Sequence, residues 1–162
     1  MKILTLITAW LITLSSLASD HPLKKVVLSY IALKDALVKA DGSLAAARAK
    51  DLVAALQEVT DAQLPASAAG NWKKLKADLL FDAGHIEETT DIGHQRDHFV
   101  TLSVNMYALL KSAGAGQTIY YQHCPMANNG KGAYWLSLDS QVKNPYYGAQ
   151  MLSCGTTKEV IR

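Results

Sequence analysis

Four stretches of helical hydrophobic spacing dominate the first 113 residues of this chain. In each stretch apolar residues recur three or four positions apart, as on a helix that buries one face. The predicted helices begin near Val26, Leu44, Asn71 and Asp91, and the second and fourth are expected to reach residues 63 and 113. A chain with this pattern has few options other than packing helix against helix.

Helix-stopping residues separate the four stretches. Asp41-Gly42-Ser43 is expected to end the first helix and to supply Ser43 as the N-cap of the second. Pro65 is expected to end the second helix, because the residue before a proline disfavours helical backbone. Gly84 lies inside the third helix and predicts a kink or break there. Short connections of this kind favour an antiparallel four-helix bundle over residues 24–113.

The composition changes at Gly114-Ala115-Gly116. Residues 118–121 and 133–136 are short aromatic or β-branched runs, which predict two strands of a small hairpin, and residues 156–161 are a candidate third strand. The expected fold is therefore mainly α: a four-helix bundle capped by a small β-hairpin-like and loop segment, residues 114–162. Residues 19–162 form one domain in this interpretation, since no linker or repeat divides them.

Residues 1–18 resemble a secretory signal peptide. Lys2 supplies a positive start, an apolar run follows over residues 3–14, and Ser16-Leu17-Ala18 matches the small-x-small pattern before a cleavage site. The apolar run is shorter than the roughly 20 residues that a membrane-spanning helix needs. We expect cleavage after Ala18 and an exported, periplasmic protein with no membrane insertion after cleavage.

Cleavage after Ala18 would place His21 third in the mature chain. The new amine, two backbone amides and this imidazole form a square-planar nitrogen set suited to Cu(II) or Ni(II). His21 is therefore an additional candidate ligand, although an ordinary solvated histidine near the terminus remains the alternative. The formal net charge of +2, without a basic cluster interleaved with aromatics, argues against a nucleic-acid partner.

Soft metal ligands are concentrated in the last quarter of the chain. Cys124 and Met126 lie two apart around a proline, and Met151 and Cys154 lie three apart before a glycine. Thiolate and thioether ligands select Cu(I) over magnesium, calcium or manganese. Two such half-sites folded together predict a copper site, with a histidine such as His98 as the nitrogen ligand.

The two cysteines have a second interpretation. In an exported protein, Cys124 and Cys154 are also expected to form a plain structural disulfide. The chain would then be an interaction domain that docks on a periplasmic efflux or respiratory assembly through the aromatic side chains of its cap: Tyr134, Trp135, Tyr146 and Tyr147. The residues leave both interpretations open.

Three histidines lie on the third and fourth predicted helices. His94 and His98 are four apart and hence neighbours on one helix face, which is a metal-capable spacing, and His85 precedes them. An enzyme is the least favoured class, because a Cys-x-x-Cys motif on a βαβ pattern is missing and no partner for a cysteine nucleophile stands at a recognisable spacing. We therefore expect a binding protein.

Five segments together resemble the family catalogued as domain of unknown function 3347. They are Arg96-Asp97-His98-Phe99 with Leu102-Ser103, Tyr121 to Ala127, Gly130 to Ser137, Asn144 to Gly148, and Met151 to Gly155. The resemblance spans essentially the whole chain after residue 18. It implies an exported domain, found alone or at the C-terminal end of adaptor subunits of heavy-metal efflux systems.

By motif position, the resemblance carries over His98, Cys124, Met126, Met151 and Cys154 as metal-site residues. His123 is an additional candidate, and His94 and His21 depend on their spacing alone. The expected function is periplasmic binding of copper, as Cu(I), for sequestration or for delivery to an efflux system or a cuproprotein.

Overall fold

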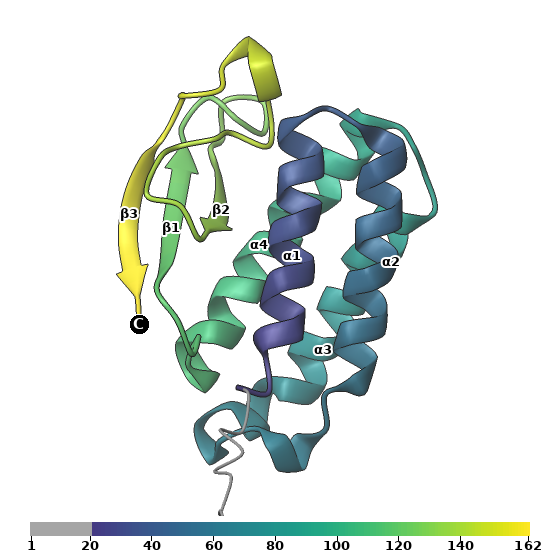
Figure 1. Cartoon of the computed structure of the whole chain (residues 1–162), viewed down its shortest axis with the longest axis vertical. Helices are drawn as coiled ribbons and strands as arrows, with labels where there is room; N and C mark the ends of the chain where they lie inside the picture. The colour runs from purple at the N-terminus through teal and green to yellow at the C-terminus, as the bar shows by residue number, and fades with distance from the viewer. Residues whose placement is uncertain (1–20) are drawn as a thin grey trace, which may run out of the picture.

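The computed structural model describes residues 21–162 as four helices followed by a small sheet (Figure 1). The helices are α1 (Lys24–Val38), α2 (Gly42–Glu58), α3 (Ala66–Glu87) and α4 (Ile92–Ala113), and the strands are β1 (Ile119–Cys124), β2 (Ala133–Ser137) and β3 (Thr156–Ile161). Short 3-10 turns occupy Asp61–Gln63 and Gly148–Gln150. The predicted fold class is confirmed. The signal peptide, its cleavage after Ala18 and residues Ser19-Asp20 of the proposed N-terminal motif lie outside the described residues.

The helices pack as neighbours in chain order, α1 on α2, α2 on α3 and α3 on α4, each antiparallel to the next (Figure 1). Each helix buries most of its apolar stripe; in α4 the buried stripe includes Phe99, Leu102, Met106, Leu109 and Leu110. None of the helices in the described part of the chain is long and apolar enough to cross a membrane.

Three details of the helices differ from prediction. Asp41, not Ser43, caps α2, because its carboxylate accepts the Leu44 N–H at 2.9 Å. The second helix ends at Glu58 and the third begins at Ala66, directly after Pro65, whose fixed dihedral suits a helix start. Gly84 does not break α3, which continues from Ala66 to Glu87, since tertiary packing outweighs the small helix-propensity cost of one glycine.

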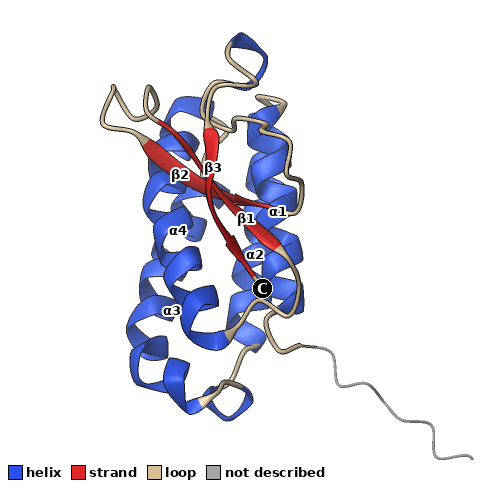
Figure 2. Cartoon of the chain, turned by 90° about the vertical axis from the view of Figure 1, so that its left-hand side faces the viewer, coloured by secondary structure: helices blue, strands red, loops and turns tan. Residues whose placement is uncertain are grey.

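The three strands form one antiparallel sheet in the order β2-β1-β3. The predicted hairpin is the β1–β2 pair, in which Cys124 lies opposite Ala133, and β3 adds to the other side of β1 with His123 opposite Thr156. Figure 2 shows the sheet lying across the bundle, where β2 contacts α4 and α1.

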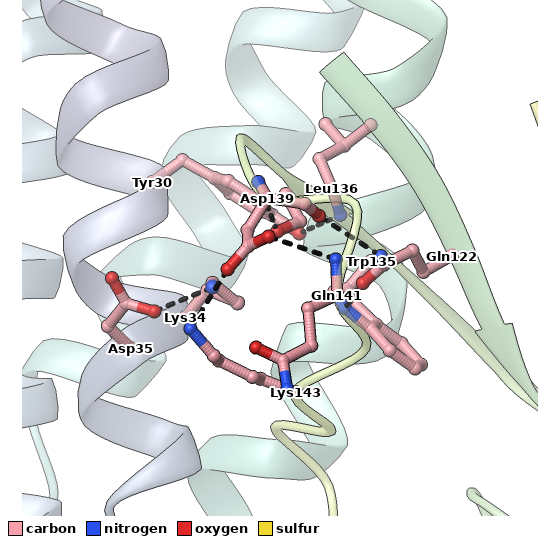
Figure 3. Close-up of polar contacts among 10 residues, drawn as sticks. Tyr30, Lys34, Asp35, Gln122, Trp135, Leu136, Asp139, Gln141 and Lys143 are labelled. Carbon is pink, nitrogen blue, oxygen red and sulfur yellow. Dashed lines mark hydrogen bonds and ion pairs between the residues drawn. The ribbon is translucent and has the colours of Figure 1, made fainter. Parts of the chain in front are cut away.

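A buried polar network joins the sheet to the bundle (Figure 3). The hydroxyl of Tyr30 on α1 lies 2.7 Å from the Ser103 hydroxyl on α4 and accepts the Leu136 N–H of β2 at 3.2 Å. Within the sheet, the side-chain oxygen of Gln122 on β1 accepts the indole N–H of Trp135 on β2 at 2.8 Å. Because buried polar groups are costly when unpaired, these bonds specify how the sheet sits on the helices.

Residues 144–154 connect the network to the helix ends. The guanidinium of Arg96 donates to the carbonyls of Pro145 at 2.8 Å and Leu37 at 3.1 Å. Gly148 has φ 57°, and a Cβ there would lie 2.7 Å from the Val38 carbonyl oxygen, so only glycine allows this approach. The segment is thereby held against α1 and α4.

Candidate functional site

A cluster of three histidines lies where α3 and α4 pack together. His85 comes from α3, and His94 and His98 come from α4, one helical turn apart. One ligand atom from each of the three lies within 4.8 Å of the others. Among the described residues, this is the one group of three or more histidine, cysteine or carboxylate side chains close enough to hold a single ion.

The imidazole of His98 is fixed by a buried carboxylate. Its Nδ1 lies 3.0 Å from Asp82 Oδ1, and the other oxygen of Asp82 accepts a 2.7 Å hydrogen bond from the Thr101 hydroxyl. Asp82 is only 5% exposed, on the inner side of α3. A carboxylate at Nδ1 favours the tautomer with the proton there, which leaves Nε2 unprotonated and available to a metal.

The other two imidazoles are less constrained. His85 stacks on His98 with ring centroids 4.6 Å apart, and His94 is exposed at 4.8 Å from His98. Nitrogens bound to one tetrahedral ion lie roughly 3.4 Å apart, given bonds of about 2.1 Å. The cluster therefore has to contract around an ion, which requires the half-buried ring of His85 and the exposed ring of His94 to turn.

Phe81 covers one side of the cluster. Its ring contacts His85 edge-on at a centroid distance of 4.5 Å and His98 at 5.9 Å, while the side chain remains 62% exposed. An apolar ring beside imidazoles limits water on that side and strengthens their interaction with a cation.

The two cysteines meet at a different place. Cys124 ends β1 and Cys154 precedes β3, and their sulfurs lie 2.7 Å apart as free thiols. Cys124 is fully buried and Cys154 half-buried. The hydrogen bond between the two thiols, followed by burial, raises the pKa of Cys154. The sequence prediction that the two half-sites fold together holds for the cysteines.

His98 does not join them. All its contacts are to residues of α3 and α4, whereas the next residue, Phe99, packs toward the sheet through Tyr146 at a centroid distance of 5.9 Å. Successive helix residues point about 100° apart, so the two side chains serve different faces of α4. The predicted set of His98 with both cysteines does not form in the described residues.

Met126 and Met151 lie in the loops next to the cysteine pair, two residues after Cys124 and three residues before Cys154. Met126 is 56% exposed and Met151 half-buried. The Met126 carbonyl accepts hydrogen bonds from the Tyr147 hydroxyl and the Gly130 N–H, and the Met151 carbonyl accepts one from the Cys154 N–H. His123 precedes Cys124 on β1 and therefore points to the opposite face, against Tyr134 at 4.2 Å. Burial and Lys158 lower the pKa of His123.

His21 lies at the start of the described chain. Its Nδ1 accepts the Leu23 N–H at 3.3 Å, and its ring packs beside Gly114 and Gly116 in the loop after α4. The proposed N-terminal Cu(II) or Ni(II) motif would need that side chain free to turn toward the amine.

Sequence reasoning did not identify Asp82 and Thr101 and did not select His85 as a ligand. A usable signal exists, because residues equally far from a short connection face each other across two antiparallel helices. The connection between α3 and α4 spans residues 88–91, so His85 is brought near His94 and Asp82 near His98.

A family model described as "Protein of unknown function (DUF3347)" matches residues 26–118. The chain belongs to the DUF3347 family. No curated protein and no solved structure gives a significant match. The DUF3347 match covers the bundle from the first turn of α1 onward, including the histidine cluster, and ends before β1, so both cysteines, Met126 and Met151 lie beyond it. Membership brings no activity with it.

Proposed function

We propose that this protein binds copper in an exported compartment and that His85, His94 and His98 hold the ion. The observation that carries the proposal is the convergence of three imidazoles within 4.8 Å, one of them oriented by a buried carboxylate. Metal-binding histidines almost always donate their second ring N–H to such a partner, and Asp82 meets that requirement.

Ligand chemistry favours copper among the ions that imidazoles bind. Neutral imidazole suits zinc, copper, iron and nickel, and among divalent first-row ions a given nitrogen site binds Cu(II) most tightly. The histidine cluster therefore shifts the proposal from a sulfur-bound Cu(I) to an imidazole-bound copper ion. Cu(I) binding by the thiols remains a separate proposal for the reduced protein.

The exposure of the cluster supports a role in sequestration or delivery. His94 is exposed and His85 partly exposed, so an ion held there stays accessible to an acceptor. Three protein ligands also leave a coordination position open, through which an ion is exchanged. Delivery to a heavy-metal efflux system or a cuproprotein rests on the family resemblance, and we propose a binding protein, not an enzyme.

Copper and zinc titrations in competition with a chromophoric chelator test the proposal. We expect one ion per chain, with affinity reduced about tenfold or more in each of His85→Ala, His94→Ala and His98→Ala. His123→Ala is the matched control, since that histidine lies on the sheet, away from the cluster. A wild-type protein that fails to compete, or a His98→Ala variant that binds as wild type does, would contradict the proposal.

The second candidate function is an interaction domain with a Cys124–Cys154 bridge. The contact between the two sulfurs at 2.7 Å favours the bridge. The aromatic docking surface is less supported, because Trp135 is fully buried and Tyr146 only 7% exposed, which leaves Tyr134 and Tyr147 half-buried at the surface. This candidate would be favoured if the purified protein neither retains metal nor takes it up, in the reduced and in the oxidised state.

A further inference from the structure

The two thiols in contact differ in access to solvent. Cys124 is 0% exposed at the end of β1, the central strand, and Cys154 is half-buried just before β3. Thirty positions separate them in the chain, and the fold brings their sulfurs to 2.7 Å. A reagent from solution therefore meets one sulfur before the other.

The backbone around both cysteines is held in place. Asn144, which is fully buried, donates from its side-chain amide to the Cys154 carbonyl at 2.9 Å, and its N–H donates to the Leu152 carbonyl at 2.8 Å. Gly155, which follows Cys154, has φ 140°. A Cβ there would lie 2.8 Å from the Trp135 ring and 2.9 Å from the His123 carbonyl oxygen. Since β1 fixes Cys124, neither sulfur needs backbone movement to reach the other.

We propose that Cys124 and Cys154 are an oxidisable dithiol with a fixed order of reaction, in which Cys154 reacts with the oxidant and Cys124 resolves the product. The oxidant is a disulfide of the thiol–disulfide exchange class, small or protein-borne. The proposal rests on contact and exposure alone and is independent of metal binding at the histidines.

The chemistry balances in two displacements. The Cys154 thiolate attacks one sulfur of the oxidant, whose disulfide bond breaks, and the departing sulfur leaves as a thiolate that takes up a proton. The Cys124 thiolate then attacks Cys154 Sγ, forms the Cys124–Cys154 bond and expels the second oxidant sulfur. In sum, this chain loses two protons and two electrons, and the oxidant disulfide becomes two thiols.

The reaction would decide which metal ligands the protein offers. A cysteine binds soft metals as the thiolate, so the oxidised pair no longer does. The histidine cluster shares no contact with the pair and keeps its ligands in either state. Oxidation is therefore expected to abolish Cu(I) binding by the two cysteines without changing binding at the histidines.

Glutathione disulfide is a suitable probe of the reduced, purified protein, with intact mass as the readout. Wild type is expected to lose the mass of two hydrogens and to accumulate no adduct. Cys124→Ser is expected to stop as a glutathione adduct on Cys154, whereas Cys154→Ser stays unmodified when folded and reacts once urea unfolds it. That last arm shows that burial protects Cys124.

A second measurement needs no variant. Brief alkylation of reduced wild type, followed by peptide mapping, should label Cys154 at least about tenfold faster than Cys124. The proposal is overturned if Cys154→Ser, folded by circular dichroism, reacts as fast as Cys124→Ser, if the two thiols of wild type alkylate equally fast, or if wild type stops at the adduct. None of these outcomes bears on the histidine titrations, so the two proposals fail separately.

Discussion

Asp82 is the residue on which the proposed histidine site depends most. It is buried, and each of its two carboxylate oxygens has a hydrogen-bond partner, one in His98 and the other in Thr101. Both partners lie on α4, so the carboxylate also ties α3 to α4. A metal-binding role for His98 requires the proton to stay on Nδ1, and this carboxylate favours that arrangement.

Asp82→Asn is predicted to weaken copper binding by about 10–100-fold. The amide N–H₂, turned toward His98, would favour the tautomer that is protonated on Nε2 and unable to bind a metal there. Competition titration measures the effect. The matched control is Asp97→Asn, which removes an exposed carboxylate next to His98 in the chain. Equal affinities of the two variants would contradict the positioning role.

The pKa of Cys154, raised by the hydrogen bond with Cys124 and by burial, sets a pH dependence for the dithiol. Since only the thiolate attacks a disulfide, the rate of oxidation is predicted to rise steadily with pH through and above the usual thiol range near 8.5. The rate is measured at several pH values by quenching the reaction at timed intervals and detecting the products by intact mass. A rate that is flat above neutral pH would show that Cys154 is already ionised.

At the scale of elements, the sheet and the segment 144–154 are attached to the bundle by few but specific contacts. Arg96, Asn144 and the close approach at Gly148 hold the segment. The cysteine pair joins the end of β1 to the residues before β3. A covalent bond at that point would restrict only the C-terminal part of the chain.

Oxidation of the pair is predicted to raise the free energy of unfolding by about 3–4 kcal/mol, from the entropy lost when a loop of about 30 residues is closed in the unfolded chain. For a chain of this size that corresponds to a melting temperature higher by roughly 10 °C. Thermal melts with and without reductant measure it, and Cys124→Ser, which cannot close the loop, is the control. A melting temperature insensitive to reductant in wild type would contradict closure.

At the scale of the whole molecule, Tyr30 joins three elements. Its ring stacks on Phe99 at 5.2 Å, and its hydroxyl bonds Ser103 of α4 and the Leu136 N–H of β2. Burial raises the pKa of Tyr30 well above its usual value, and burial has the same effect on Tyr146. Both tyrosines are therefore neutral in the folded protein at pH values where an unfolded chain ionises them.

This difference predicts loss of stability in alkali. Above about pH 10 the unfolded chain releases the tyrosine protons and the folded chain keeps them, so the free energy of unfolding falls as pH rises. Tyr30→Phe should cost about 1–3 kcal/mol at neutral pH, because Leu136 N–H and Ser103 lose their partner. Above pH 10, denaturant melts should show that the free energy of unfolding of Tyr30→Phe falls less steeply with pH than that of wild type. The difference in slope is expected to be about 1.4 kcal/mol per pH unit. Equal slopes for the variant and wild type would contradict the inference that Tyr30 stays neutral in the folded protein.

Much of the fold follows from local patterns. The period of the apolar residues sets the helices, and the stop after Ala113 and the aromatic runs set the strands, because side-chain period and turn chemistry are properties of neighbouring residues. Helix ends follow less directly from local patterns. Capping at Asp41 instead of Ser43, and a continuous helix through Gly84, depend on packing that local sequence does not contain.

The sequence by itself determined the fold class, and it predicted that Cys124 meets Cys154 because both interpretations of the cysteines require the contact. Only the tertiary structure decided where the histidines go. The rotation of α4 turns His98 toward α3 and Phe99 toward the sheet, and residues equidistant from the connection at 88–91 then complete the cluster. That outcome depends on how two helix faces are oriented about their axes, which the burial of the whole core sets and which no short stretch of residues specifies.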